Sequence, residues 1–541
     1  MFRLTYRFLQ TSFSIQKIKR KKFWNNVKYS NQIHPLFFSN IGPFLLILVV
    51  LLGLVGCRLD SVTLPVEFEE STQKPKIYPD YSDILIPPNI APLNFVIEET
   101  GDQFVVQISS NNGTSQTFKG PKIDIPLRFW KSLLNEPNIS NINIDVFVRQ
   151  KEQWTKFAPV IQTISNDPID SWVSYRLIEP GYEFYHRLGL YQRNLETFDE
   201  TAFFRNEPVH LTTCVNCHSF QNRKTDNFMF HTRNGFGGTT IVQNGKAVKI
   251  DTKCEELISA CTYPAWHPNE PFIAFSVNKT FQFFHSKSLQ KIEVLDSYSD
   301  LVLFDVETRT IRPIFKTPHI FETFPSWSQD GLSLYYCAAE LKLNHPFGSE
   351  ERILELKESY QNLKYNLMRI SFDPQTRQFG EPEKVVDAAK MDKSIVHPRS
   401  SPDGRFLLFT LANFGTFPIW HSESDLWILD QETGETRILS EVNSERAESW
   451  HTWDSSGRWF VFSSRRDDGL FTRLYFTHFE NGQASKPFLL PQRDPYQNLE
   501  RMKSYNIPEM MIEPVDVKMP ELIRAIKIET PLKANYKAGL K

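Results

Sequence analysis

Two cysteines and a histidine stand together near the middle of the chain, in the sequence Cys214-Val215-Asn216-Cys217-His218. The C-x-x-C-H spacing is that of a c-type haem attachment site. Each thiol can add across one haem vinyl group, and the imidazole that follows can then bind the iron as the proximal ligand. We therefore expect one haem c, attached covalently to Cys214 and Cys217, with His218 on the iron.

Two other kinds of site are open to the same residues. C-x-x-C is also the spacing of a redox dithiol, and it forms one half of many zinc sites. A zinc site needs a second ligand pair at similar spacing. No further C-x-x-C is formed by the remaining cysteines, which are Cys57, Cys254, Cys261 and Cys337. Haem is the interpretation that also uses His218.

A sixth iron ligand is expected on the strand that follows the motif. Met229 and His231 are two residues apart, so on a strand both side chains point to one face. Methionine ligation raises the reduction potential of a haem, and bis-histidine ligation lowers it. We expect Met229 or His231 in this role, with Met229 favoured, and His210 is a third candidate.

Haem attachment of this kind requires an exported chain, and the N-terminus predicts one. A basic segment, 17–28, precedes an apolar stretch, 43–55, that is too short to span a bilayer and has the length of a signal-peptide core. The stretch ends in Leu54-Val55-Gly56-Cys57, which resembles a bacterial lipobox. The resemblance implies removal of residues 1–56, acylation of Cys57 and residence at the periplasmic face of a membrane, with the outer membrane favoured over the inner. A plain signal anchor is the alternative.

The composition favours a β-rich protein that does not bind nucleic acid. The formal net charge is −2, so no polybasic field is present for a nucleic-acid partner. Aromatic residues make up 13% of the chain, which also has 34 Pro and 22 Gly, as expected for strands punctuated by turns. Cys254 and Cys261 are close enough in sequence to form a disulfide in an oxidising compartment, and the alternative is that both are buried and unpaired. Cys337 is expected in the core.

The first folded segment is predicted to be a small β-sandwich. Residues 57–88 are polar and rich in proline, which indicates a tether. Residues 89–168 contain four short apolar or alternating runs that are separated by turn signals. The last run, 142–148, alternates cleanly, so one of its faces should be buried. We expect an immunoglobulin-like or fibronectin-like domain over residues 89–168.

The second half of the chain repeats one pattern four times. The copies begin at Tyr263, Phe324, His397 and His451. Each consists of an aromatic-capped strand, a turn with Asp-Gly or its equivalent, and a fully apolar strand. A second pair of strands lies between the copies, because residues 299–308 and 424–433 match at five polar positions. Four strands per unit are typical of a propeller blade.

The copies resemble the WD40-like PD40 repeats of TolB-type β-propellers, over about residues 210–490. The C-x-x-C-H takes the place of the first strand motif of a blade when His218-Ser219-Phe220 is aligned with Pro264-Ala265-Trp266. This alignment makes five blades, and the resemblance implies six. The sixth is expected from residues 172–178 and 189–195, and the alternative is five blades with a linker around the haem.

The predicted organisation is therefore all-β. The TolB-like propeller is expected over residues 169–500, with the haem site at 214–218. Residues 501–541 are predicted to be a tail outside the propeller, either a strap across it or partly disordered.

The whole chain resembles a group of lipoproteins, common in Bacteroidetes-type bacteria, in which a TolB-like propeller carries one C-x-x-C-H. This resemblance implies no defined activity. The chain has no G-x-S-x-G nucleophile elbow, and no acid, base and nucleophile set emerges, which favours an electron carrier or binding protein over an enzyme. We expect electron transfer or redox sensing with an envelope protein partner, such as another redox protein. The alternatives are a non-enzymatic scaffold with a structural haem and a haem enzyme with an open iron site.

Overall fold

A computed structural model describes residues 62–180, 187–286, 290–317, 319–346 and 348–538. The chain is nearly all β, and residues 62–541 form one compact unit. The predicted signal segment, 1–56, and the predicted lipid attachment site, Cys57, lie outside the described residues. In the part of the chain that is described, no helix is both long and apolar enough to cross a bilayer.

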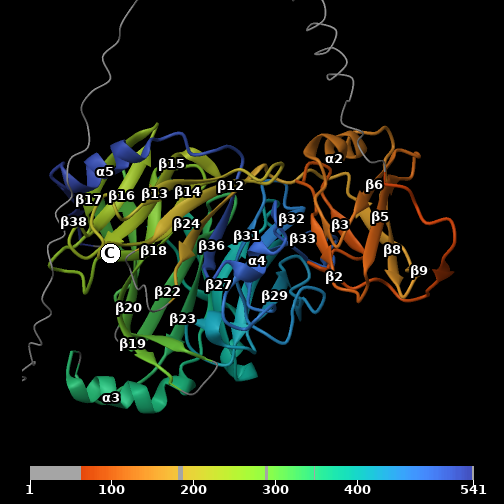
Figure 1. Ribbon diagram of the computed structural model, residues 1–541. Coiled ribbons are helices and arrows are strands. Elements are labelled where there is room, and N and C mark those ends of the chain that lie inside the picture. The colour runs from red at the N-terminus through yellow and green to blue at the C-terminus, as the bar shows by residue number, and fades with distance from the viewer. Residues whose placement is uncertain (1–61, 181–186, 287–289, 318, 347, 539–541) are drawn as a thin grey trace, which may run out of the picture. The chain divides into compact units, whose positions relative to one another are not determined.

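Six antiparallel sheets form the blades of a propeller (Figure 1), and each blade runs outward from an inner strand. Blade 1 contains β36 (Ser504–Met511), β11 (Trp172–Ile178), β12 (Gly189–Asn194) and β13 (Glu200–Arg205). Blade 2 contains β14 (Cys214–Gln221), β15 (Lys224–Arg233), β16 (Gly238–Gln243) and β17 (Lys246–Asp251). Blade 3 contains β18 (Cys261–Trp266), β19 (Phe272–Phe284), β20 (Ile292–Asp305) and β21 (Thr310–Pro313).

The other three blades follow in chain order. Blade 4 contains β22 (Ile320–Trp327), β23 (Ser333–Glu340), β24 (Asn366–Asp373), β25 (Gln378–Phe379) and β26 (Glu383–Val386). Blade 5 contains β27 (Ser394–Ser400), β28 (Phe406–Ala412), β29 (Asp425–Asp430) and β30 (Thr436–Ile438). Blade 6 contains β31 (Glu448–Trp453), β32 (Trp459–Ser464), β33 (Arg473–Glu480), β34 (Gln483–Ala484) and β35 (Phe488–Leu489).

The inner strands β36, β14, β18, β22, β27 and β31 contact one another in a closed ring. This closure confirms six blades and rules out the five-bladed alternative. The predicted strands at 172–178 and 189–195 are present as β11 and β12. Their inner partner comes from the far end of the chain, because β36 pairs antiparallel with β11. The prediction that residues 501–541 lie outside the propeller is therefore wrong for β36.

The rest of the C-terminal segment runs along the outside of blades 2 and 3. Helix α5 (Met519–Lys527) packs its buried Leu522 and Ile526 into the apolar cluster of blades 1 and 2. Strand β37 (Leu532–Lys533) then pairs in parallel with β17, and β38 (Asn535–Tyr536) pairs in parallel with β21. These short strands cover two sheet edges that would otherwise present unpaired backbone groups. This segment is the strap that was one of the two predicted alternatives.

The N-terminal domain contains two sheets that share one apolar core, as a sandwich requires. The larger sheet contains β1 (Glu69–Glu70), β9 (Gln153–Lys156), β8 (Asn141–Gln150), β10 (Val160–Ile164), β3 (Ile84–Ile86), β5 (Gln103–Ser110) and β6 (Ser115–Lys119). The smaller sheet contains β2 (Ile77–Tyr78), β4 (Phe95–Ile97) and β7 (Lys122–Ile123).

Two predictions for this region are wrong. Strands β1, β2 and β3 lie within residues 57–88, so most of the predicted tether belongs to the folded domain. A helix, α2 (Leu127–Leu134), lies within the segment 89–168, for which only a β-sandwich was predicted. Its buried residues Trp130, Leu133 and Leu134 have the three- and four-residue spacing of one helix face.

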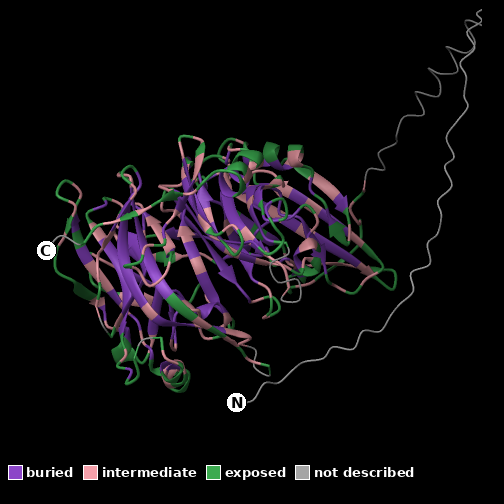
Figure 2. Cartoon of the chain, turned by 90° about the vertical axis from the view of Figure 1, so that its left-hand side faces the viewer, coloured by how far each residue is buried: buried purple, intermediate pink, exposed green. Residues whose placement is uncertain are grey.

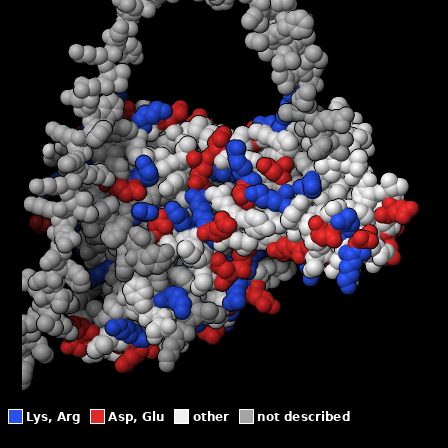
Figure 3. Space-filling model, viewed as in Figure 1, with Lys and Arg blue, Asp and Glu red and all other residues white. Residues whose placement is uncertain are grey.

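The remaining helices are short and lie in connections. They are α3 (Glu350–Ser359), η1 (Tyr360–Asn362), η2 (Ala388–Met391), η3 (Pro418–Trp420) and α4 (Gln497–Glu500). Buried residues concentrate in the strands, whereas exposed residues concentrate in loops and short helices (Figure 2). Positive and negative side chains are interspersed on the face seen in Figure 3. That face presents no large field of one sign, in agreement with the net charge of −2.

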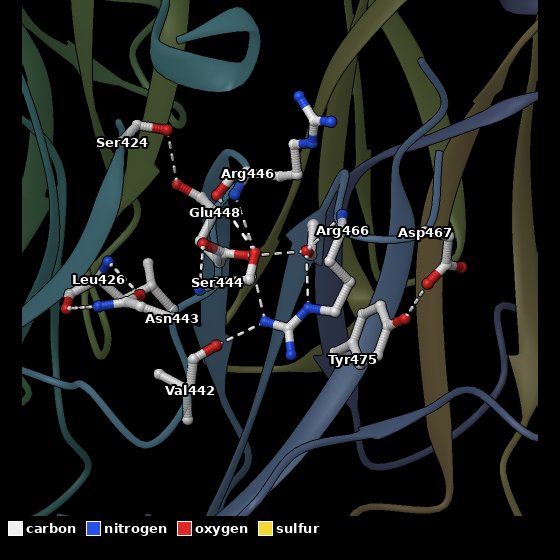
Figure 4. Close-up of polar contacts among 11 residues, drawn as sticks. Ser424, Leu426, Val442, Asn443, Ser444, Arg446, Glu448, Arg466, Asp467 and Tyr475 are labelled. Carbon is white, nitrogen blue, oxygen red and sulfur yellow. Dashed lines mark hydrogen bonds and ion pairs between the residues drawn. The ribbon is translucent and has the colours of Figure 1, made fainter. Parts of the chain in front are cut away.

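A buried carboxylate links the start of blade 6 to its neighbouring loops (Figure 4). Glu448 accepts hydrogen bonds from the hydroxyls of Ser444 and Ser464, both at 2.7 Å, and from Nη2 of Arg466 at 3.1 Å. The Arg466 guanidinium also lies 4.4 Å from the centre of the Tyr475 ring. Burial raises the pKa of Glu448, and the charge of Arg466 opposes that effect. The network therefore holds a carboxylate where water cannot reach it.

A second buried ion pair joins blade 5 to the long hairpin of blade 3. Nε2 of His421 lies 2.9 Å from Oε2 of Glu293, and both side chains are buried. Burial acts to lower the pKa of His421, but the hydrogen bonds and charges of Glu293 and Glu423 outweigh it and raise the pKa from 6.5 to about 9. His421 is therefore protonated at neutral pH.

This raised pKa predicts a loss of stability at alkaline pH. The contribution of a protonated His421 is fully present below its unfolded-state pKa of 6.5 and is lost as the pH rises through about 9. Urea unfolding is measured at one pH below 6.5 and at one pH above 9. Between these two conditions, the free energy of unfolding should fall more for the wild type than for His421→Gln. Substitution of the exposed His345 by Gln serves as the control. Equal falls in wild type and His421→Gln would contradict the charged pair.

Candidate functional site at the propeller axis

Each inner strand is interrupted by a β-bulge at an equivalent place. The first bulge residue has a positive φ, between 45° and 56°, at Cys217, Tyr263, Phe324, His397, Trp450 and Ile507. A bulge bends its strand and redirects side chains. The aromatic members lie close together, with ring centres 4.4 Å apart for Tyr263 and Phe324 and 3.7 Å apart for His397 and Trp450. We call these six residues the axial ring.

Cys217 is therefore one of six equivalent residues around the axis. The residue after each axial-ring member is proline in four strands and histidine in the other two, at His218 and His451. The bulges of β14 and β18 coincide when His218 is aligned with Pro264, as the sequence alignment predicted. The histidine of the C-x-x-C-H thus occupies a repeat position that a histidine also takes without any neighbouring cysteine.

His218 and His451 differ in their surroundings. Nε2 of His451 lies 3.1 Å from the backbone oxygen of Leu408. Both ring nitrogens of His218 are buried and have no hydrogen-bond partner among the described residues. Burial, with a smaller contribution from the charge of Arg176, lowers the pKa of His218 to about 3. Its imidazole is therefore neutral at pH 7, which is the form that binds a metal.

The two cysteines of the motif are buried free thiols that face different surroundings. Cys214 packs in the apolar cluster of blades 1 and 2, together with Phe228 and Phe230. Cys217 lines a pocket at the axis together with His218. Burial raises the pKa of the Cys217 thiol, so the reactive thiolate is suppressed in the folded chain.

The donor set suits a c-type haem, but the space in front of it does not. Two free thiols and a neutral imidazole with unpartnered nitrogens are the groups that this attachment needs. The pocket lined by Cys217 and His218 has a volume of about 30 Å³, the share of one water molecule. The axial-ring side chains Tyr263, Phe324 and Trp450 line the same pocket. A haem against His218 requires these side chains to move away from the axis.

The candidate sixth ligands lie elsewhere. Met229 is fully buried in an apolar cluster of blades 2 and 3. His231 lines a separate cavity of about 540 Å³, and its Nδ1 lies 2.9 Å from Oγ1 of Thr239. Its Nε2 has no hydrogen-bond partner in the described part of the chain. His210 is exposed, and its Nδ1 lies 2.8 Å from Oγ1 of Thr212. The structure thus brings Cys217 and His218 together at one pocket but does not bring these three side chains to it.

The other cysteines that the structure describes, Cys254, Cys261 and Cys337, are also free thiols. Cys254 and Cys261 lie in one cluster without a disulfide, and burial raises the pKa of Cys261 to about 12. Cys337 is buried in the core of blades 4 and 5, as predicted. No group of three or more His, Cys, Asp or Glu side chains in the described ranges is arranged to hold a metal ion.

Charged residues at the axis were not identified from the sequence. The third position of the repeat is occupied by Ser219, Ala265, Ser326, Arg399, Thr452 and Glu509. Four of these are small, and the charged Arg399 and Glu509 line the axis. Arg223, in the turn between β14 and β15, lines the same axial cavity as Arg399 and Glu509. The available signal was Pro398-Arg399, at the place where two other copies have Pro264-Ala265 and Pro325-Ser326.

No protein-family model and no curated protein matches the chain. Among solved structures, it is similar to an oligogalacturonate lyase in complex with manganese (12% identity, TM-score 0.29, covering 63% of this chain and 86% of the lyase). It is also similar to a prolyl endopeptidase (12% identity, TM-score 0.33, covering 59% of this chain and 42% of the endopeptidase). A third similar structure is an ancestral GH74 enzyme (9% identity, TM-score 0.29, covering 82% of this chain and 63% of that enzyme). Similarity at this level carries no argument about activity, and the six-bladed fold rests on the strand topology.

Proposed function

We propose that this chain is an envelope lipoprotein whose propeller carries one c-type haem, attached to Cys214 and Cys217 with His218 as proximal ligand. It would transfer electrons to a periplasmic protein partner or sense redox state with it. The observation that supports the haem is the contrast between His218 and His451, which share a repeat position but differ in hydrogen bonding. A bound c-type haem exchanges single electrons through its iron.

The burial of the motif supports a particular order of assembly. Cys214 and Cys217 are 8% and 3% exposed, and they lie in an inner strand next to β36, the last inner strand to be made. An attachment reaction cannot reach thiols inside a closed ring. The thioether bonds would therefore form before β36 closes the propeller, while the side chains of the axial ring are still apart.

The remaining parts of the proposal concern coordination and location. His231 would be the sixth ligand rather than Met229 once the side chains of the axial ring move away from the axis. Its Nε2 is buried, lies next to a large cavity and has no hydrogen-bond partner among the described residues, whereas Met229 is enclosed by apolar side chains. Acylated Cys57 would anchor the chain at the periplasmic face of a membrane, with the outer membrane favoured. Nucleic acid is not a proposed partner.

Covalent haem should be visible on a denaturing gel that is stained for haem peroxidase activity. The wild-type band should stain, and a Cys214→Ser/Cys217→Ser double variant should lose the stain completely, because both thioether bonds are gone. A Cys254→Ser/Cys261→Ser variant is the matched control and should stain like the wild type. An unstained wild-type band, from a strain that matures other c-type cytochromes, would contradict the proposal.

The second candidate function is a protein-binding scaffold of the envelope, with haem serving structure alone or absent. It is favoured by the closely packed axial ring and by the volume of about 30 Å³ next to His218. If it is correct, the Cys214→Ser/Cys217→Ser variant should still capture the natural partner and restore the phenotype of a deletion strain. If electron transfer is the function, the variant should fail to restore the phenotype even where the partner still binds.

A further inference from the structure

A cavity of about 140 Å³ lies at the axis next to the pocket of Cys217 and His218. All six inner strands contribute to its wall. The space exists because the third repeat position is small in four strands, at Ser219, Ala265, Ser326 and Thr452. Trp266 and Trp327 form part of the wall, and each indole N–H is fixed by a backbone oxygen at 3.1 Å. These two indole side chains therefore hold part of the cavity wall in place.

Two guanidinium groups line this cavity. Nη1 of Arg399 donates one hydrogen bond, at 3.0 Å, to the backbone oxygen of the preceding residue, Pro398. Arg223 donates to the backbone oxygen of Trp453 at 3.1 Å and to Oδ1 of Asn222 at 3.2 Å. Neither guanidinium forms an ion pair with a carboxylate of the described residues. A guanidinium has five N–H donors, so most of these donors remain available to a ligand.

The one carboxyl group at the cavity does not neutralise the two cations. Oε2 of Glu509 accepts a hydrogen bond from the backbone N–H of Phe220 at 3.0 Å. Burial raises the pKa of Glu509 to about 8, although Arg399 and Arg223 act against this. Burial also lowers the pKa of both arginines. The charges of Asp170, Asp454 and Glu509 offset part of the effect of burial on Arg223, and that of Glu509 offsets part of it on Arg399. Burial remains the largest influence on both guanidinium groups, and a desolvated positive charge favours an anion beside it.

We infer that this axial cavity binds a small oxyanion, a carboxylate or a phosphate, between Arg223 and Arg399. Planar guanidinium groups bind both kinds of anion through two parallel hydrogen bonds. At about 30 Å³ for each water, a volume of about 140 Å³ corresponds to four or five waters, which suits one anionic group and excludes a whole nucleotide. The site uses no haem, although Arg399 and Glu509 also line the pocket of Cys217 and His218.

Calorimetric titration of the purified protein at pH 7 tests the site, with inorganic phosphate and acetate used separately. At least one of the two anions should bind with one-to-one stoichiometry. Arg399→Leu should weaken that binding at least tenfold, and Arg399→Lys, which keeps the charge but not the fork, should weaken it less. Arg128→Leu, at an exposed position of α2, is the control and should bind like the wild type.

The outcomes separate the sources of the anion and decide the inference. Binding of phosphate alone assigns a phosphate group, binding of acetate alone assigns a carboxylate, and either result supports the site. If Arg399→Leu does not fold, Arg223→Gln replaces it, and the rise in the wild-type melting temperature with anion concentration gives a second measure of binding. Absence of binding by both anions, or equal binding by the wild type and the arginine variant, would overturn the inference.

Discussion

A chain that ends at residue 503 is expected not to fold, whereas a chain that ends at residue 512 is expected to fold with reduced stability. The shorter chain lacks β36, the inner strand of blade 1, so the ring cannot close. Tyr505, Met510 and Met511 are buried, and losing three such side chains removes roughly 5–9 kcal/mol of burial free energy, which is comparable to the whole stability of a domain. Urea unfolding followed by circular dichroism measures the difference.

The chain that ends at residue 512 is the matched control, because it keeps β36 and loses the strap. It should show a cooperative transition at a lower urea concentration than the full chain, since Leu522 and Ile526 of α5 no longer pack on the apolar cluster of blades 1 and 2. A cooperative, wild-type-like transition in the chain that ends at 503 would show that β36 is dispensable, and the closure described for blade 1 would then be wrong.

Replacing Glu448 by alanine is expected to lower the free energy of unfolding by about 3–5 kcal/mol, because removal of one partner leaves Arg466 without its buried counter-charge. Two serine hydroxyls lose their acceptor as well. Glu448→Gln, which keeps the shape and part of the hydrogen bonding, should cost less. Equilibrium unfolding in urea measures both variants.

A double-mutant cycle separates the pair from its surroundings. Glu448→Ala combined with Arg466→Ala should cost less than the sum of the single variants, because neither charge is then left unpaired. Glu445→Ala, three residues away and exposed, is the control and should change stability by no more than about 0.5 kcal/mol. Strict additivity of the two single variants would contradict the network seen in Figure 4.

The sequence predicted the blades well because each blade carries its own local signal. An aromatic residue, then proline or histidine, then a turn and an apolar run recur within a short stretch, and the structure confirms six sheets with equivalent bulges. Strand β36 also carries the signal, as Ile507-Pro508-Glu509. It was missed because its partner strand, β11, lies more than 300 residues earlier in the sequence, so β36 is not followed by the second strand of a hairpin. Strands β1 to β3 were missed because two or three residues are too few to show an alternating pattern.

The candidate site was predictable in chemistry but not in place. Residue types and spacing were enough to single out Cys217 and His218. Their position at the axis depends on a bulge whose first residue has a positive φ, and in none of the six inner strands is that residue a glycine or an asparagine. Without the bulges, the sequence could not show that Arg399 and Glu509 would face the same axis as the haem motif.

The six left-handed residues of the axial ring also bear on how the propeller can be divided. Each non-glycine residue held at positive φ costs about 1–3 kcal/mol, so the ring as a whole stores roughly 6 kcal/mol or more. That energy is recovered only where the neighbouring inner strands pack against each bulge. A fragment of two or three blades would keep the cost at every bulge and lose the packing at its open ends. The blades are therefore not interchangeable modules like those of an open repeat array, whose stability grows with every unit added. In this propeller, the cost of all six bulges is offset only when the ring of inner strands is closed.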